Sequence, residues 1–291
     1  MNDKPENKPI ERKPVEHKLI EHRGRIIRAE IRTKATPQQA YDAWADPEKI
    51  AHWFPDRAEG KAEPGATITW IFDKFNYRIP YEVLIAEPAE KFAIRWNPPP
   101  GMNAGVLEVT ISKEGGETVI RLVNSGFREG AEWNEEFEGT DSGWRMALAL
   151  LKHYLENYFG TPRASFLVMR PAEFSFDQAV QFQRTAAGLK QWLTKSGEYG
   201  EVGENFVLEL EEGGKASGRA LAKTKRETTL GWDEIRGVLE LKAFSMGPQK
   251  MLCVRGCGWG LSAEKAKELE GLMERAVERL ASALAEHKAS A

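Results

Sequence analysis

Cysteine is scarce in this chain. Two cysteines, Cys253 and Cys257, occur among 291 residues, which is too few for a disulfide framework. On one strand their Cα atoms would lie about 13 Å apart, at roughly 3.3 Å per residue, and a mutual bridge cannot span that distance. No cluster of His or Asp accompanies them, so we expect no metal site and interpret both as small, buried or half-buried side chains.

Strong net charge and long apolar runs are also lacking. The formal net charge is −3 and the pI about 6.1, so no strong field attracts nucleic acid or an anionic membrane surface. No apolar run is long enough to span a bilayer, and the first residues are polar rather than signal-like. We therefore predict a cytoplasmic protein without a nucleic-acid partner or a membrane span.

The length of 291 residues and a hydrophobic content of 41% indicate two globular domains. Residues 1–22 stand apart, because they are rich in Lys, Glu and Pro and contain a degenerate five-residue repeat, "KPIER", "KPVEH", "KLIEH". Such a segment has little to bury, so we predict a flexible arm. The alternative is an extended arm whose Ile10, Val15 and Ile20 touch a partner or the second domain.

In the first half, apolar and polar residues alternate as in the strands of a sheet, and helical patterns lie among and after these runs. Residues 25–36 predict a strand, Thr36 and Gln39 a capping box, and 37–46 a helix that ends before Pro47. A short helical turn is expected over 47–53. Five alternating runs between 65 and 127 then predict an antiparallel meander with one buried face. Residues 141–160 predict a long amphipathic helix, with Gly160 at its C-terminal cap.

The second half repeats this order. In both halves an Ala is followed thirteen positions later by a Trp, from Ala40 to Trp53 and from Ala179 to Trp192. Strand-like runs follow at 205–210, 216–225, 236–245 and 249–257, and a long helix capped by Ser262 ends the chain. We infer a tandem duplication in which the second copy is shorter and more diverged.

Several stretches of the first half together resemble a known family. They are "IRTKATPQQAYDAWADPEKIAHWF", "GATITW", "EVTISKEGGETVIRLVNSGF" and "GWRMALALLKHYLE". The resemblance is to the START-like, helix-grip (SRPBCC) superfamily, and within it to homologues of the activator of the heat-shock-protein-90 ATPase. It implies an α+β fold in which a curved antiparallel sheet wraps around a long C-terminal helix. We expect this fold twice, as domains over residues 23–160 and 164–287.

A cavity between sheet and helix is common in this superfamily, so the resemblance implies a site for a small hydrophobic, lipid- or polyketide-like ligand. The inward faces are large and aromatic, which suits such a ligand. The alternative is that the same residues simply fill a core. The predicted ligand-binding residues are Trp53, Phe54, Trp70, Phe72, Tyr77, Tyr81, Trp96, Val109, Trp144, Leu148 and Leu151.

No catalytic constellation is visible: the sequence has no G-x-S-x-G, H-E-x-x-H or phosphate-binding loop motif. Glu135 and Glu136 are expected in a solvated loop before the long helix, and Glu108 on an outer face. We therefore predict a non-enzymatic binding protein without cofactor. One alternative is a co-chaperone-like module that binds a chaperone or another protein. Another is a polyketide cyclase-like enzyme, in which Tyr77, Tyr81 and His153 would be tested first.

The stretch "DPEKIAHWFPD" (46–56) has the composition of a site, with a His beside two aromatics. The second copy keeps the Trp but replaces His52 by Gln191 and Phe54 by Leu193. We therefore interpret Ile50, Trp53 and Phe54 as a structural gate at the mouth of the first cavity. His52 is predicted to be a surface residue.

Overall fold

The computed structural model describes residues 20–98, 104–246 and 249–289. Most of the predicted N-terminal arm lies outside these residues. In the described part of the chain, no helix is long and apolar enough to cross a membrane.

The first half forms a seven-stranded antiparallel sheet in the order β1-β7-β6-β5-β4-β3-β2. Its strands are β1 (Arg25–Thr33), β2 (Arg57–Gly60), β3 (Thr67–Phe72), β4 (Tyr77–Glu87), β5 (Lys91–Trp96), β6 (Gly105–Glu114) and β7 (Glu117–Phe127). Its helices are α1 (Pro37–Ala45), α2 (Pro47–Ala51), the 3-10 turns η1 (Asp73–Phe75) and η2 (Ala131–Trp133), and α3 (Asn134–Asn157). We call residues 25–160 the first unit.

The second half has the same topology, with strand order β8-β14-β13-β12-β11-β10-β9. Its strands are β8 (Arg163–Pro171), β9 (Thr194–Glu198), β10 (Asn205–Leu210), β11 (Lys215–Lys223), β12 (Glu227–Trp232), β13 (Gly237–Met246) and β14 (Gln249–Trp259). Its helices are α4 (Phe176–Arg184), α5 (Ala186–Leu189), the 3-10 turn η3 (Asp233–Ile235) and α6 (Ala263–Ala289). We call residues 163–289 the second unit. The fold class predicted from the sequence is thus confirmed.

Equivalent side chains make equivalent bonds in the two units. Trp53 Nε1 donates to the carbonyl of Ala43 at 2.8 Å, and Trp192 Nε1 donates to the carbonyl of Phe182 at 3.0 Å, ten residues earlier in both cases. The capping box at Thr36 and Gln39 also has a counterpart, at Ser175 and Gln178. These shared details support the inferred duplication. The domain boundaries at 23–160 and 164–287 remain a prediction.

Helix α3 begins seven residues earlier than the sequence pattern indicates, at Asn134 rather than residue 141. Glu135 and Glu136 therefore lie in its first turn and not in a loop, where their carboxylates favour the positive end of the helix dipole. The prediction began too late because Gly139 lies in the missed stretch, and glycine costs about 1 kcal/mol relative to Ala inside a helix.

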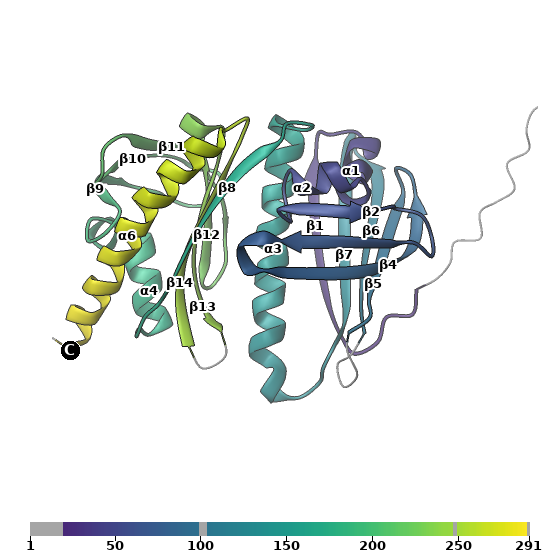
Figure 1. The fold of residues 1–291 in the computed structure, drawn as a ribbon, viewed down its shortest axis with the longest axis horizontal. Helices are drawn as coiled ribbons and strands as arrows, with labels where there is room; N and C mark the ends of the chain where they lie inside the picture. The colour runs from purple at the N-terminus through teal and green to yellow at the C-terminus, as the bar shows by residue number, and fades with distance from the viewer. Residues whose placement is uncertain (1–19, 99–103, 247–248, 290–291) are drawn as a thin grey trace, which may run out of the picture.

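The two units stack as four layers: first sheet, α3, second sheet and α6 (Figure 1). Helix α3 contacts β1 of its own sheet on one side and β11 and β12 on the other. Accordingly, the core around α3 includes Val238, Cys257 and Trp259 of the second unit. The second unit's own core lies on the other side of its sheet, under α6. Helix α3 is therefore covered on both sides by sheets.

Candidate functional site: a cavity between the first sheet and α3

A pocket of about 410 Å³ opens between the first sheet and the N-terminal half of α3. Strands β4 to β7 supply one wall, and η2 and α3 supply the other. Its lining residues are Tyr81, Trp96, Gly105, Leu107, Asn124, Ser125, Gly126, Phe127, Arg128, Trp133, Glu136, Thr140 and Trp144. The volume lies within the range of small-molecule sites, roughly 300–1,000 Å³.

Aromatic rings close the inner end of this pocket. Phe54 is stacked on Trp144 with 5.4 Å between ring centroids, and Trp70 packs on Tyr81 at 4.7 Å. Trp53 lies deeper, edge-on to Trp44 at 4.9 Å. Because these rings fill the middle of the concave face, the open volume remains only beside the start of α3.

Hydrogen bonds fix the polar part of the wall. Trp144 Nε1 donates to Asn124 Oδ1 at 2.9 Å, and Asn124 Nδ2 donates to the carbonyl of Val106 at 3.1 Å. The guanidinium of Arg128 lies over the ring of Trp133, 3.9 Å from its centroid. Burial raises the pKa of Tyr81, so its hydroxyl stays protonated at neutral pH. The wall therefore presents rigid aromatic faces with a few oriented polar groups.

The predicted ligand-binding residues fall into four groups. Tyr81, Trp96 and Trp144 line the pocket. Phe54 and Phe72 line a smaller gap between the two units. Tyr77 is 50% exposed at the start of β4, beyond the end of β5, and does not line the pocket. The remaining residues are buried in the core: Trp53, Trp70, Val109, Leu148 and Leu151.

Sequence reasoning missed Arg128, Trp133, Glu136 and Thr140, all of which line the pocket. Glu136 and Thr140 were missed because the start of α3 was placed too late, whereas Arg128 and Trp133 lie between β7 and α3. Trp133, Glu136 and Thr140 are spaced three and four residues apart, as on one face of a helix. This spacing would have extended the predicted helix toward its N-terminus.

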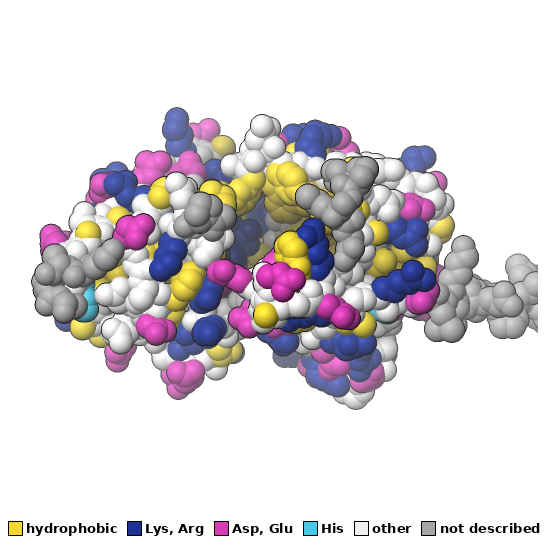
Figure 2. Space-filling model, turned by 90° about the horizontal axis from the view of Figure 1, so that it is seen from below, with side chains coloured by type: hydrophobic (Ala, Val, Ile, Leu, Met, Phe, Trp, Pro, Cys, Tyr) yellow, Lys and Arg dark blue, Asp and Glu magenta, His cyan; other side chains and the backbone are white. Residues whose placement is uncertain are grey.

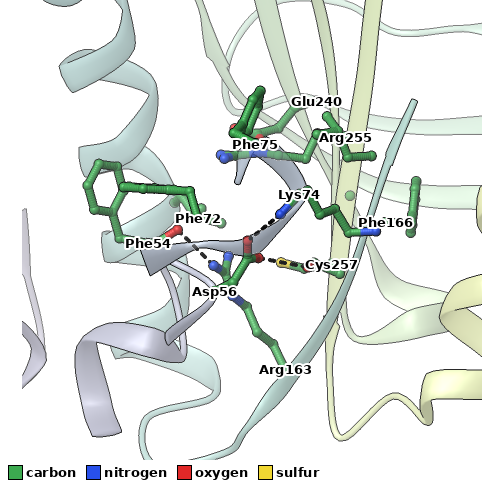
Figure 3. A pocket seen from close by; sticks show the side chains of 14 residues that line it. Phe54, Asp56, Phe72, Lys74, Phe75, Arg163, Phe166, Glu240, Arg255 and Cys257 are labelled. Carbon is green, nitrogen blue, oxygen red and sulfur yellow. Dashed lines mark hydrogen bonds and ion pairs between the residues drawn. The ribbon is translucent and has the colours of Figure 1, made fainter. Parts of the chain in front are cut away.

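The segment "DPEKIAHWFPD" forms the joint between the units (Figure 3). Arg163 at the start of β8 donates to the carbonyls of Trp53 and Phe54, both at 2.8 Å, and of Pro55 at 3.0 Å. Trp259 Nε1 donates to the carbonyl of His52 at 2.8 Å. The gap at this joint is only about 20 Å³, so it holds the units together and has no room for an organic ligand.

His52 is buried, with 5% of its surface exposed, so its predicted surface position is wrong. Its Nδ1 lies 3.3 Å from the hydroxyl of Tyr154, and burial lowers its pKa. The physical reason is the second unit, since Trp259 stacks on Tyr154 and covers the segment. His153 is half-buried, and burial lowers its pKa as well. It contacts the same Trp259, at the end of α3 that is far from the pocket.

A chain of polar contacts lies on the outer face of the first sheet. His22 Nδ1 is 2.9 Å from Ser125 Oγ, and its Nε2 is 3.2 Å from Glu108 Oε2. Glu108 is buried under this contact and paired with Lys91 at 2.9 Å, so its predicted exposure is wrong. The adjacent Gly126 N–H donates to the carbonyl of Arg23 and is not available to an oxyanion. The arrangement therefore fastens His22 and Arg23 to the sheet.

Both cysteines are buried and free, as predicted. Burial raises the pKa of Cys253 to about 11 and also raises that of Cys257, which leaves the thiols protonated and unreactive. Among the described residues no group of His, Cys, Asp and Glu could hold a metal ion.

The first unit thus has the helix-grip architecture, a curved antiparallel sheet closed by a long C-terminal helix. Residues 34–156 match the model of the family described as Activator of Hsp90 ATPase homolog 1-like protein, which confirms for this unit the resemblance seen in the sequence. No curated protein matches the chain.

Solved structures similar to this chain include one of a single unit and two that span both. The Aha1 dimer from Colwellia psychrerythraea is 20% identical, covering 46% of this chain and 97% of that chain, with a TM-score of 0.41. DynU16, from the dynemicin biosynthetic locus, is 17% identical over 91% of this chain and 98% of that one, with a TM-score of 0.41. BexL, a di-domain ARO/CYC from the BE-7585A biosynthetic pathway, is 14% identical over 91% and 95%, also at 0.41. These likenesses concern the fold alone.

Proposed function

We propose that the first unit binds a small hydrophobic, lipid- or polyketide-like ligand in the cavity between its sheet and α3, without catalysing a reaction. The observation that carries this proposal is the 410 Å³ pocket walled by Trp96, Trp133 and Trp144. Aromatic faces contribute apolar contact, while the oriented groups of Asn124 and Tyr81 can fix one polar end of a ligand.

A cavity-filling substitution tests the proposal. Gly105 lines the pocket, and a Cβ there would meet only the carbonyl oxygen of Ser125, at the ordinary contact distance of 3.4 Å. Gly105→Leu should therefore fill the pocket without disturbing β6. Native mass spectrometry and solvent extraction of the purified protein should find a bound apolar molecule in the wild type and none in Gly105→Leu.

A matched control places the same change elsewhere. Gly271 lies on α6, where a Cβ would meet only the end of the Arg275 side chain at 3.8 Å. Gly271→Leu should retain the ligand. Equal ligand content in all three proteins, or none in the wild type, would count against the proposal.

A second candidate is a co-chaperone-like module that binds a chaperone of the heat-shock-protein-90 class. The description of the matching family favours it. Pull-down and an ATPase assay with that chaperone would test it, and unchanged turnover would argue against it.

A third candidate, a polyketide cyclase-like enzyme, is favoured by Asn124, Arg128 and Glu136 in the pocket wall. It requires product formation from a polyketide-type substrate, and loss of that activity in Glu136→Gln.

A further inference from the structure

A second cleft lies beside the proposed cavity, between the N-terminal half of α3 and the outer face of the second sheet, and Glu136 and Thr140 border both. We call it the α3 cleft. It consists of two adjoining pockets of about 910 and 670 Å³. Both pockets are lined by Glu135, Gly139, Arg226, Glu227, Phe244 and Ser245. Figure 2 shows a hollow near the middle of the molecule on this face.

The cleft exists because the side chains on one face of α3 change from small to large along the helix. In the C-terminal half, the large side chains of Met146 and Leu150 are 1% exposed, in the layer between the two sheets. One and two turns earlier the same face carries Gly143 and Gly139. Large apolar side chains therefore fill the gap between α3 and the second sheet at the C-terminal end of the helix. At the N-terminal end this face carries the two glycines instead, and the gap stays open.

Nothing in the backbone requires glycine at these two positions. Their φ angles are not positive, and a Cβ built on either would meet no atom within 4 Å. Inside a helix each glycine nevertheless lowers stability relative to Ala. Gly139, which lines both pockets, thus lowers helix stability and leaves the cleft open beside it.

The floor of the cleft carries a balanced set of charges on neighbouring strands. Lys242 Nζ lies 3.4 Å from Glu227 Oε2 and 3.9 Å from Glu240 Oε1. Arg255 pairs with Glu240 from the facing position on β14. Two carboxylates and two cations cancel, so a ligand with net charge would disturb this balance in a partly desolvated space.

Two side chains that line the cleft are held by long ion pairs among the described residues. Glu227 is 9% exposed, and its covered Oε2 has the 3.4 Å ion pair with Lys242 but no hydrogen bond from any described residue. Lys242 lines the cleft, and in the described part of the chain its contacts are ion pairs at 3.4 Å and beyond. A mostly buried carboxylate held by so long an ion pair is incompletely satisfied, so a ligand hydroxyl would supply a hydrogen bond that the described residues do not.

Apolar side chains surround this polar floor. Leu167 and Met169 of β8, Phe75 of η1 and Phe244 of β13 line the same pocket. A hydroxyl group can donate to a carboxylate and accept from an ammonium at once. We propose that the α3 cleft binds a neutral, apolar molecule carrying a hydroxyl group, which donates to the Glu227 carboxylate and accepts from Lys242 Nζ.

The test uses the full-length protein and three probes of one shape: naphthol, naphthalene and the anion naphthoate. Titration calorimetry and fluorescence measure affinity and stoichiometry. For the cleft we expect naphthol to bind at least about tenfold more tightly than either relative, because a hydrogen bond to a charged group is worth that much. Glu227→Gln, which keeps the size but removes the charged acceptor, should reduce this preference about tenfold. Equal binding of all three probes would overturn the proposal.

Filling variants separate the cleft from the first cavity. Gly139→Leu should remove naphthol binding at the cleft, whereas Gly139→Ala, which adds one carbon atom in open space, should retain it. Gly139→Leu should fold at least as well as wild type, because Leu has the higher helix propensity. Gly105→Leu should affect only the cavity beside β6. Naphthol binding unchanged by Gly139→Leu would refute the cleft site, and an effect of Gly105→Leu alone would leave only the proposed cavity.

Discussion

The contact of Arg163 with the segment after α2 allows a quantitative prediction about how the two units are held together. The guanidinium donates to four main-chain carbonyls, those of Ala51 at 3.2 Å, Trp53 and Phe54 at 2.8 Å, and Pro55 at 3.0 Å. Met at this position keeps the length of the side chain and removes every donor. The four carbonyls then lose their common partner.

The magnitude follows from the number and kind of these bonds. A hydrogen bond from a charged donor contributes about 1.5–3 kcal/mol net. The four bonds share one side chain, so they are not additive, and Arg163 borders a small gap that water can enter. We therefore expect Arg163→Met to lower the free energy of unfolding by about 3 kcal/mol. Arg163→Lys, which keeps the charge but not the planar fork of donors, should lose about 1–2 kcal/mol.

Urea unfolding followed by tryptophan fluorescence measures the effect. Arg170→Met is the matched control, because Arg170 is also on β8 but pairs with Glu278 at the surface; it should change stability by less than about 1 kcal/mol. In Arg163→Met the weakened joint should also separate the unfolding of the two units. Stability of Arg163→Met within about 0.5 kcal/mol of wild type would refute the reasoning.

Two further substitutions test the electrostatics of the buried layer. Burial lowers the pKa of His52, so below about pH 6.5 the unfolded chain binds more protons than the folded one, and stability falls as the pH decreases. The variant His52→Gln carries the residue that the second unit has at the equivalent position, Gln191. Its urea midpoints at pH 7.5 and 5.5 should differ less than those of the wild type. An equal difference in the two proteins would contradict the prediction. Although burial alone would raise the pKa of Glu240, Arg255 and Lys242 hold it well below its usual range. Glu240→Gln should lower the free energy of unfolding by about 3–5 kcal/mol, because it leaves a buried cation unpaired. Adding Arg255→Met should recover most of this loss. A thermal midpoint of Glu240→Gln equal to that of the wild type would disprove the prediction.

Features of secondary structure that depend on a few neighbouring residues were predicted correctly from the sequence. The capping box at Thr36 was predicted and is present, because cap and partner are three residues apart. Alternation predicted six of the seven strands of the first sheet, since side chains on a strand must point to opposite faces, and missed the short edge strand β2. In the second unit the same reasoning missed β8, β9 and β12. Every residue of β12 is buried, so no alternation marks it.

The candidate site was predicted only in part. Trp96 and Trp144 were expected in the wall and are there, but Trp53 and Trp70 fill the core instead. All four are aromatic residues on the inward face, and the sequence pattern assigns them the same role. Which of them borders an open volume depends on how far the rings of neighbouring elements reach.

The sequence by itself determined most elements of the first repeat, the order of the main elements in the second, and the resemblance of the first unit to its family. These follow from periodicity, from caps and from short motifs, all of which act over a few residues. The tertiary structure alone decided what lies between the repeats. It placed the second sheet on α3, buried His52 under Trp259, and opened a cleft beside Gly139. Those outcomes depend on contacts between residues 82 to 207 positions apart, and no local pattern records them.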